Sequence, residues 1–365
     1  MSHTKQTLTP LIGSSLVVGG NGFLGFHLVR QILQDDECGD VHVLDVDVSK
    51  NRHEEASYFE GSITDAQLVR KTIADTRPTV IYHTASPTAL LPAKREGEYW
   101  KTNVEGTEIL LNAALESDAV KAFVFTSSVD VYANPPHADV DETFPLWKDS
   151  NKSNEYNRTK AIADILVRQA NSPQLRTVSL RPGHGYGERH TQGLVEVLDM
   201  CKNKKIFQIG DGSNLMEVAS GENCAIAHVL AAKALLDPTR AAGNVEGEAF
   251  NVSDGAPVPF WHHMGVIWKT ARGEDVFKDV VILPAWVMIS AVVLVEWFYW
   301  VFTFNTVKPP GELRRVSLHY CVYTNTFSIE KARKTLKFNP ISNHDAVVSQ
   351  SARWMLEYQE SKKNM

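Results

Sequence analysis

The first half of the chain alternates short apolar runs with longer amphipathic stretches. The runs SLVVGG, VHVLDV, TVIYHTA and AFVFTSS are rich in β-branched residues. Their apolar positions are continuous rather than strictly alternating, which is typical of strands covered on both faces. Between these runs, FHLVRQILQ, DAQLVRKTIAD and NVEGTEILLNAALES have the amphipathic pattern of helices. This alternation predicts an α/β fold in which a doubly wound parallel sheet carries helices on both faces.

A change of pattern near Gly183 divides the chain. Up to that point the alternation continues through a helix that contains YNRTK and a strand, TVSLRPG. Beyond it the sequence becomes irregular, with turn-rich pieces such as GDGSN and SDGAPVP. We therefore expect a nucleotide-binding core at 11–182, to which the chain returns around 222–254. The stretches 183–221 and 255–365 should form a smaller, mainly C-terminal substrate-binding lobe.

Residues 280–304 form a long apolar segment in which only Glu296 is charged. Its length of 25 residues is close to the roughly 20 that a membrane-spanning helix needs. Because Pro284 and Glu296 divide the segment, we expect either a buried or interfacial helix of the substrate lobe or a helix that attaches the protein to a lipid surface. A spanning helix is a third alternative. The aromatic residues that suit a membrane interface are Trp286, Trp297, Tyr299 and Trp300.

The composition is that of a globular protein with a modest negative charge. Of the 365 residues, 43% are hydrophobic and 22% are charged, and the formal net charge is −6. This balance provides no basic field for the phosphates of a nucleic acid, so we expect no nucleic-acid partner.

Cysteine usage indicates neither a disulfide framework nor a metal site. The chain has no C-x-x-C pair, and its four cysteines are widely spaced, which favours a reducing compartment. The N-terminal MSHTKQTLTP lacks the apolar core of a signal peptide. We therefore expect a cytoplasmic protein without a bound metal. His262 and His263 are interpreted as surface or packing residues, since adjacent side chains need not converge. The cysteines are Cys38, Cys201, Cys224 and Cys321.

A glycine array follows the first predicted strand. Gly19, Gly22 and Gly25 have the spacing G-x-x-G-x-x-G and lie between an apolar strand and an amphipathic helix. Glycines at such a turn let the backbone approach a pyrophosphate closely, and the helix N-terminus offers free N–H groups to it. This context predicts a Rossmann-type dinucleotide site.

Asp45 ends the next strand, VHVLD, 20 residues beyond Gly25 (45 − 25). A carboxylate at this place accepts hydrogen bonds from the adenosine ribose and repels a 2′-phosphate, so it favours NAD over NADP. Asp47 is an alternative, and Ser62, Ile63 or Asp65 could border the adenine. The expected cofactor-binding residues are Gly19, Gly22, Phe23, Leu24, Gly25, Asp45, Ser62, Ile63, Thr84, Ala85, Ser86, Tyr156, Lys160 and Pro182.

Tyr156 and Lys160 are the expected catalytic pair. They are four residues apart in a helical segment, YNRTKAIAD, so both side chains lie on one face about one turn apart. A free tyrosine, with a pKa of about 10, is a poor base at neutral pH. A nearby ammonium stabilises the phenolate and makes proton transfer with an alcohol feasible.

Two further residues complete the predicted site. Ser128 follows the strand AFVFT and would project from the carboxyl edge of the sheet, where it can donate a hydrogen bond to a developing alkoxide. Ser127 and Thr126 are local alternatives. Asn103 lies near the start of a helix packed behind the site; it is either a helix cap or a support for Lys160 through water.

With these motifs, the chain resembles the extended short-chain dehydrogenases and, among them, the 3β-hydroxysteroid dehydrogenase family with its fungal decarboxylating sterol dehydrogenases. The similar segments include VVGGNGFLG, IYHTASP, FTSSVDVY, YNRTKAIAD and LRPGHGYG, and the likeness extends through LPAWVMISAVVLVEWFYW to the C-terminal part. The resemblance thus covers nearly the whole chain.

The resemblance implies that Ser128, Tyr156 and Lys160 form the catalytic set, with Asn103 alongside. It implies oxidation of a 3β-hydroxyl on a hydrophobic polycyclic substrate, with NAD as the acceptor. A carboxylate on the adjacent carbon would then be lost as carbon dioxide. If the apolar segment 280–304 attaches to lipid, we expect peripheral membrane contact at the cytoplasmic face of the endoplasmic reticulum or at lipid droplets. A homodimer through two long core helices is expected by analogy of fold.

This sequence departs from the family pattern at two places. Ser62 stands where family members often have Asp, and EVASGEN replaces DFVYVEN near the substrate lobe. The substrate could therefore be a triterpenoid or meroterpenoid alcohol rather than a common sterol.

Three other functions share parts of this pattern. A nucleotide-sugar epimerase or dehydratase has the same cofactor loop, Ser and Y-x-x-x-K, but needs polar and cationic groups for a diphosphate, which the apolar 280–304 segment does not provide. A ketoreductase of fungal secondary metabolism is a second alternative. A non-catalytic nucleotide-binding protein is a third, which the joint presence of Ser128, Tyr156 and Lys160 argues against.

Overall fold

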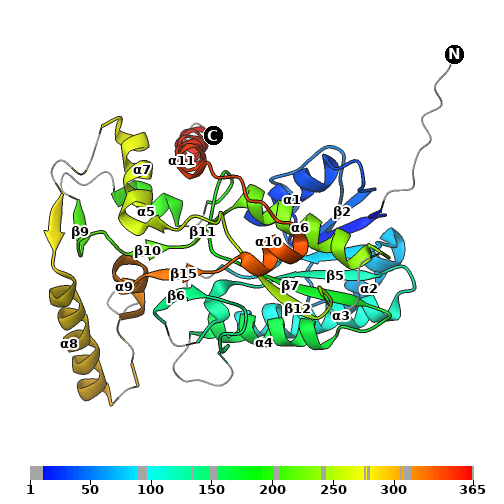
Figure 1. Cartoon of the computed structure of the whole chain (residues 1–365), viewed down its shortest axis with the longest axis horizontal. Helices are drawn as coiled ribbons and strands as arrows, with labels where there is room; N and C mark the ends of the chain where they lie inside the picture. Colours follow the sequence, from blue (N-terminus) through cyan, green and yellow to red (C-terminus); the bar gives the residue numbers. More distant parts are fainter. Residues whose placement is uncertain are drawn as a thin grey trace.

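The computed structural model describes most of the chain, which divides into a larger and a smaller half (Figure 1). The larger half is built on a wide sheet with helices on both faces, and the smaller half is a group of helices and short strands. The described residues are 11–88, 97–133, 135–147, 154–191, 193–200, 206–239, 244–274, 277, 280–304, 306–307, 309 and 315–363.

The sheet of the larger half has seven strands, all parallel. From β1 the chain winds outward through β2 and β3, then returns to β4 and winds the other way. The carboxyl ends of β1 and β4 therefore mark the switch point, where such sheets bind ligands. The spatial order is β12 (Glu248–Val252), β7 (Arg176–Pro182), β5 (Ala122–Thr126), β4 (Val80–His83), β1 (Ser15–Val18), β2 (Val41–Asp45) and β3 (Ser57–Glu60).

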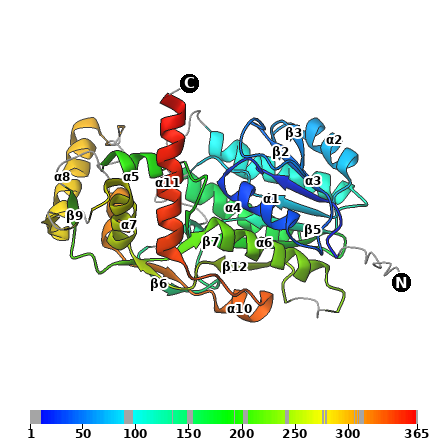
Figure 2. The same cartoon turned by 90° about the horizontal axis from the view of Figure 1, so that it is seen from above.

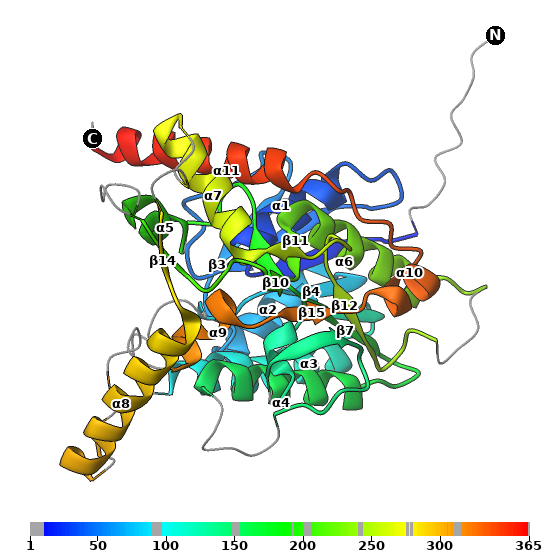
Figure 3. The same ribbon diagram turned by 60° about the vertical axis from the view of Figure 1, so that its left-hand side comes forward.

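Helices cover both faces of this sheet (Figure 3). A hydrophobic core lies between the sheet and the helices on each face. In β1, Val17 faces one core while Leu16 and Val18 face the other, and all three are fully buried. The predicted doubly wound α/β fold is thus confirmed. One core includes α1 (Phe23–Leu33), α6 (Gly221–Leu236) and α10 (Glu330–Leu336); the other includes α2 (Ala66–Thr76), α3 (Gly106–Glu116) and α4 (Glu155–Gln169).

The smaller half contains three short sheets. They are a four-stranded sheet of β13 (Val258–Pro259), β10 (Leu215–Met216), β15 (Asn325–Phe327) and β6 (His137–Val140), and the pairs β11 (Val218–Ser220) with β8 (His184–Tyr186) and β14 (Val281–Leu283) with β9 (Phe207–Ile209). The chain passes between the halves several times. β6 comes from within 11–182 yet pairs with β15, whereas α10 packs against β12 and α6 of the large sheet.

An aromatic core holds the helices of the smaller half together. Trp261 and Trp268 pack with Val348 and Met355, which joins α7 (Phe260–Arg272) to α11 (His344–Lys363). The two helices lie side by side in Figure 2. The other helices of this half are α5 (Leu194–Met200), α8 (Ala285–Thr303) and α9 (Arg315–Val322).

Helix α8 corrects the interpretation of the apolar segment. Pro284 is its N-cap and Glu296 lies within it, so neither residue divides the helix. The helix is also not buried, because only 6% of its most apolar 18-residue window lies inside the protein. It projects from the smaller half in Figures 1 and 3. By length and composition alone, α8 could cross a membrane.

The three described cysteines, Cys38, Cys224 and Cys321, are free thiols. Burial raises the pKa of Cys38 to about 12 and that of Cys321 to about 11, so these thiols stay protonated. Cys201 lies outside the described residues.

Candidate active site

The turn after β1 requires glycine for two geometric reasons. Gly19 has a φ of +83°, and a Cβ on it would lie 2.6 Å from the backbone nitrogen of Ala85. A Cβ on Gly25 would overlap the carbonyl oxygen of Gly19. The turn, the first turn of α1 and the chain after β4 therefore approach one another at backbone distance, as a pyrophosphate-binding turn requires.

A cavity of about 680 Å³ lies beside this turn, at the switch point of the sheet. It brings together many of the predicted cofactor-binding residues, namely Gly19, Gly22, Asp45, Ser62, Ile63, Thr84, Ala85 and Ser86. It is also lined by residues that the sequence did not single out, including Asn21, Lys50, Lys101 and Thr102. Predicted residues that do not line it are Phe23, Leu24, Gly25, Tyr156, Lys160 and Pro182.

Three of these residues lie around the cavity rather than on its wall. The ring of Phe23 lies 4.6 Å from that of His190 at a tilt of 56°, so it links the glycine turn to the smaller half. Leu24 packs against the core under α1. Pro182 ends β7 and pairs with Val252 of β12.

Asp45 is held by backbone donors at the end of β2. Its Oδ2 accepts a 2.9 Å hydrogen bond from the N–H of Asn21, and its Oδ1 accepts one of 3.3 Å from the N–H of Asp47. Burial raises the pKa of Asp45, although these hydrogen bonds oppose the shift. Asn21 also donates its side-chain amide to the carbonyl oxygen of Lys50 at 2.5 Å. Asn21 therefore joins the glycine turn to the loop after β2. Its position inside the glycine array GGNGFLG was the sequence signal that could have indicated this role.

Tyr156 and Lys160 lie on the first two turns of α4, which Asn154 caps through a hydrogen bond to the N–H of Asn157. Burial raises the pKa of Tyr156 well above its ordinary value; Asp130 adds to this effect and the side chain of Ser128 opposes it. A Tyr156 whose pKa lies this high is protonated in this structure.

The ammonium of Lys160 faces the end of β5. Its Nζ donates a 2.5 Å hydrogen bond to the carbonyl oxygen of Thr126 and lies 4.3 Å from the ring centroid of Phe125. Burial lowers the pKa of Lys160 to about 7, against the opposing charge of Asp164. Lys160 is therefore a group that gains or loses its charge near neutral pH, and it is not among the groups that shift the pKa of Tyr156.

Ser128 follows β5 and caps a short 3-10 turn, η2 (Val129–Val131). Its Oγ accepts from the N–H of Asp130 at 3.1 Å and donates to Oδ2 of Asp130 at 3.3 Å. The other carboxylate oxygen of Asp130 accepts a 2.6 Å hydrogen bond from the hydroxyl of Tyr320, on α9. Of the local alternatives, Thr126 pairs its hydroxyl with His228 of α6.

Asp130 and Tyr320 were not among the predicted site residues. Tyr320 lies 190 residues away in the chain, so sequence spacing gave no sign of this contact. Asp130 places a carboxylate beside Ser128 and Tyr156 and connects them to the smaller half.

Asn103 is not a helix cap. It lies inside a π-helical turn, η1 (Trp100–Glu105), and is buried. Its amide nitrogen donates to Oγ1 of Thr159 at 3.0 Å, and its Oδ1 accepts from Oγ of Ser86 at 2.8 Å. It thus joins the cavity wall at Ser86 to α4 at the residue before Lys160.

A fully buried ion pair joins α4 to β7. Asp164, one turn after Lys160, accepts hydrogen bonds of 2.7 and 3.0 Å from the guanidinium of Arg181 on β7. Arg181 also donates to the hydroxyl of Tyr132 at 3.0 Å. Burial alone would raise the pKa of Asp164, but Arg181 and a hydrogen bond from Ser179 hold it below its ordinary value.

A second, smaller cavity of about 180 Å³ lies in the smaller half. It is formed by the β8 segment, α5, α7 and α11, and it includes His184, His190 and His263. The ring of His184 lies 6.0 Å from that of Tyr320. Asp130, Tyr320 and His184 thus form a chain of contacts from Ser128 to this cavity.

The residues present fit NAD. The glycine turn leaves room for a pyrophosphate, and the carboxylate of Asp45 lines the same cavity. Together with Ser128, Tyr156 and Lys160 at the carboxyl edge of the sheet, this arrangement defines an extended short-chain dehydrogenase/reductase.

The chain belongs to the 3-beta hydroxysteroid dehydrogenase/isomerase family, which it matches over residues 16–278. The predicted family is therefore confirmed, and with it the class of enzyme, an oxidoreductase that acts on a CH–OH group, and the cofactor, NAD.

Curated relatives match nearly the full length of the chain. It is 33% identical to the sterol-4-alpha-carboxylate 3-dehydrogenase ERG26, decarboxylating, of Saccharomyces cerevisiae, an alignment that covers 95% of this chain and 99% of the yeast protein. It is 31% identical to the protein of the same name from Candida albicans, over 94% and 98% of the two chains.

Solved structures share the fold. The UDP-Glc/GlcNAc 4-epimerase of Campylobacter jejuni matches with a TM-score of 0.71 at 20% identity, over 94% of this chain and 99% of the epimerase. The Bordetella bronchiseptica enzyme WbmG, solved in complex with NAD, matches with a TM-score of 0.67 at 19% identity, over 94% of each chain. At this identity the likeness establishes the fold alone.

Proposed function

We propose that this protein oxidises the 3β-hydroxyl of a steroid or triterpenoid-like substrate to a ketone. The observation that carries the proposal is the cavity formed by the glycine turn and Asp45 at the carboxyl edge of the sheet. At the same edge Ser128 follows β5, and the ammonium of Lys160 meets the carbonyl oxygen of Thr126. The relatives named as sterol-4-alpha-carboxylate 3-dehydrogenases support the substrate class.

In this proposal each side chain has one task. Ser128 donates a hydrogen bond to the substrate oxygen, and Tyr156 takes the proton of the hydroxyl. Lys160 would hold the nicotinamide ribose, and its charge would favour the phenolate of Tyr156. NAD held in the cavity would supply the hydride acceptor for the carbinol carbon. Asn103 holds α4 at Thr159 and so positions Lys160.

The substrate is proposed to occupy the smaller half. Its cavity of about 180 Å³ is smaller than the roughly 300–1,000 Å³ typical of small-molecule sites. A flat polycyclic ligand would therefore extend beyond it, and we assign residues 183–221 and 255–365 to a substrate-binding lobe, except for α10, which packs on the large sheet. If a carboxylate is attached next to the new ketone, the product is a β-keto acid, which loses carbon dioxide without further help from the protein.

The test follows NADH absorbance with purified protein, NAD and a panel of 3β-hydroxysteroids that includes a 4α-carboxylate. Tyr156→Phe should lower kcat/KM by about 10²–10⁴-fold, the usual contribution of a general base. Tyr358→Phe, on α11, is the matched control and should retain activity. Carbon dioxide release with the carboxylate substrate would show whether decarboxylation follows.

Two results would overturn the proposal. If no steroid or terpenoid alcohol is oxidised but a nucleotide sugar is epimerised or dehydrated, the enzyme belongs with the sugar-modifying members of this fold. If NADH is consumed with a polyketide-like ketone and no 3β-alcohol is oxidised, the chain is a ketoreductase of secondary metabolism.

The exposed face of α8 supports a further proposal, peripheral contact with a membrane through residues 280–304. Trp286, Leu294, Trp297 and Phe302 expose between 60% and 72% of their surface. Such a patch of large apolar and aromatic side chains is rare on a soluble surface and suits the interface of a bilayer. A hydrophobic substrate dissolved in that bilayer would then reach the lobe directly, at the endoplasmic reticulum or at lipid droplets.

Flotation with phosphatidylcholine–phosphatidylserine vesicles tests this attachment. The wild type should float with the vesicles. The double variant Trp297→Ser, Phe302→Ser should remain unbound at the bottom of the gradient. Met200→Ser, which removes an exposed apolar residue outside α8, is the control. Resistance to alkaline extraction would indicate a spanning helix instead, and vesicle-independent self-association would indicate that α8 pairs with a second copy.

A homodimer through two long core helices is proposed on the analogy of fold alone. Sedimentation of the Trp297→Ser, Phe302→Ser variant measures this association. Because the variant has fewer apolar side chains on α8, contacts through α8 contribute less to the result.

A further inference from the structure

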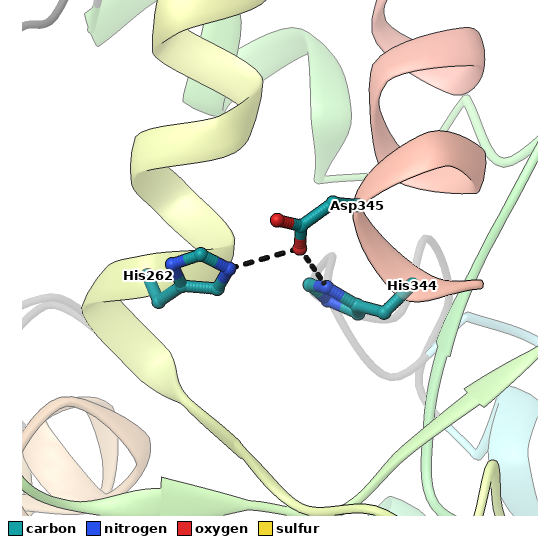
Figure 4. Close-up of side chains that lie close together, drawn as sticks. All are labelled: His262, His344 and Asp345. Carbon is teal, nitrogen blue, oxygen red and sulfur yellow. Dashed lines mark hydrogen bonds and ion pairs between the residues drawn. The ribbon is translucent and has the colours of Figure 1, made fainter. Parts of the chain in front are cut away.

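The first turns of α7 and α11 bring three potential ligand residues together (Figure 4). Oδ1 of Asp345 lies 2.9 Å from Nε2 of His262 and 2.7 Å from Nδ1 of His344. All three atoms lie within 4.8 Å of one another. His262 is more than 80 residues from the other two in the chain, so only the packing of α7 against α11 creates the cluster.

We propose that His262, His344 and Asp345 bind a divalent transition-metal ion, Zn²⁺ or an ion of similar preference such as Co²⁺. Two imidazole nitrogens and one carboxylate oxygen form a donor set that suits zinc, whereas Mg²⁺ and Ca²⁺ favour oxygen ligands throughout. Three protein ligands leave the fourth tetrahedral position to water.

The geometry needs only a small adjustment. With metal–ligand bonds of about 2.0–2.1 Å, neighbouring donors of a tetrahedral site lie roughly 3.3 Å apart. The two hydrogen-bonded separations of 2.9 and 2.7 Å are a few tenths of an ångström shorter. The metal would take the place of the hydrogens that now face Asp345. A neutral ring then keeps its proton on the other nitrogen, and a protonated ring releases one on binding.

His263 supports the site from behind. Its Nδ1 lies 2.9 Å from Nε2 of His344, and it is buried. Burial, with the neighbouring histidines, holds the pKa of His263 well below its ordinary value, so its ring is neutral. If the Nε2–H of His344 donates to Nδ1 of His263, then Nδ1 of His344 carries the lone pair that a metal requires. A ligand histidine fixed through its other nitrogen is the usual arrangement around bound zinc.

The site is open to ions from solution. The side chains of His262 and Asp345 are 48% and 59% exposed, whereas that of His344 is 12% exposed. Behind the cluster, His263 of α7 and Val348 of α11 line the 180 Å³ cavity. A bound ion would therefore fix the separation of two helices that form this cavity.

Calorimetric titration of untagged, chelator-treated full-length protein with Zn²⁺ tests the proposal. We expect one ion per chain, a smaller affinity at lower pH, and zinc–nitrogen distances of about 2.0–2.1 Å by X-ray absorption. Co²⁺ in place of Zn²⁺ should give the visible absorption of a tetrahedral site.

Three variants locate the ion. His262→Ala and Asp345→Asn should each lower the affinity at least tenfold, and both residues are exposed enough for the fold to tolerate the change, which circular dichroism would check. His263→Gln, which alters only the support, should lower it by about 10–100-fold. His42→Ala, on β2, is the control and should bind as the wild type does. The proposal would be overturned if the wild type does not bind Zn²⁺. It would also be overturned if His262→Ala and Asp345→Asn bind Zn²⁺ with the affinity of the wild type.

Discussion

At the scale of single residues, Asp130 is the side chain whose effect on the chemistry is easiest to isolate. Its negative charge raises the pKa of Tyr156, after burial itself, and so opposes the phenolate that oxidation needs. Asp130→Asn keeps an oxygen that can accept from Tyr320 but removes the charge. The pKa of Tyr156 should fall, and the rising limb of the kcat/KM profile for oxidation should move to lower pH by roughly one unit.

The control for this shift is Asp141→Asn, which neutralises an exposed carboxylate after β6. Its profile should coincide with that of the wild type. A limb that stays in place in Asp130→Asn would mean that Tyr156 does not set the pH dependence.

Lys160 gives a second prediction at this scale, because its burial makes the stability of the protein depend on pH. Its pKa is about 7 in the folded protein and 10.5 for a free side chain. Between these values the unfolded chain binds a proton that the native state lacks, so stability rises with pH, by up to about 1.4 kcal/mol per unit. Lys160→Met has no such group. The wild type should therefore gain stability relative to Lys160→Met as the pH rises from 7 to 10 in urea unfolding.

Other titrating groups are common to both proteins and cancel in this comparison. Lys121→Met removes an ammonium exposed at the surface. Its free energy of unfolding should change with pH in parallel with that of the wild type. Parallel curves for Lys160→Met would show that Lys160 keeps its charge in the folded protein.

At the scale of elements, the Asp164–Arg181 pair fixes α4 to β7. Both side chains are fully buried, so removing one leaves the other charged without a partner. Asp164→Ala should lower the free energy of unfolding by about 3–5 kcal/mol. Glu116→Ala breaks an ion pair with Arg70 in which both side chains are more than half exposed, so its loss of stability should be much smaller than that of Asp164→Ala. Urea unfolding measures both, and equal losses would contradict this assignment.

The regular elements of the larger half could be predicted because local sequence determines them. The apolar runs became β1, β2, β4 and β5, and the glycines of the first turn are required by contacts within that turn and with Ala85. The prediction for the apolar segment was wrong where it treated Pro284 and Glu296 as breaks. Proline suits a helix start, and one carboxylate costs little on a helix exposed to solvent.

At the scale of the whole molecule, the contacts that could not be predicted join distant parts of the chain. Asp130 meets Tyr320 across 190 residues, and His262 meets Asp345 across 83. Each pair depends on how the smaller half packs, and no spacing within one motif records that packing. Asn103 shows the same limit: its position was predicted, but its partners, Ser86 and Thr159, lie on other elements.

Cofactor preference is a property of the whole fold that a single side chain can change. A ligand at a hundredfold excess over its Kd stabilises the native state by about 2.7 kcal/mol, so NAD should raise the Tm of this protein measurably. NADP at the same concentration should raise it less, because Asp45 lines the cofactor cavity and its carboxylate repels a 2′-phosphate. Asp45→Asn keeps an oxygen for the N–H of Asn21 but loses the charge, and should bring the two Tm shifts closer together. Asp47→Asn, on the same loop, is the control. If Asp47→Asn reduces the difference between the NAD and NADP shifts in Tm while Asp45→Asn does not, then Asp47 selects the cofactor.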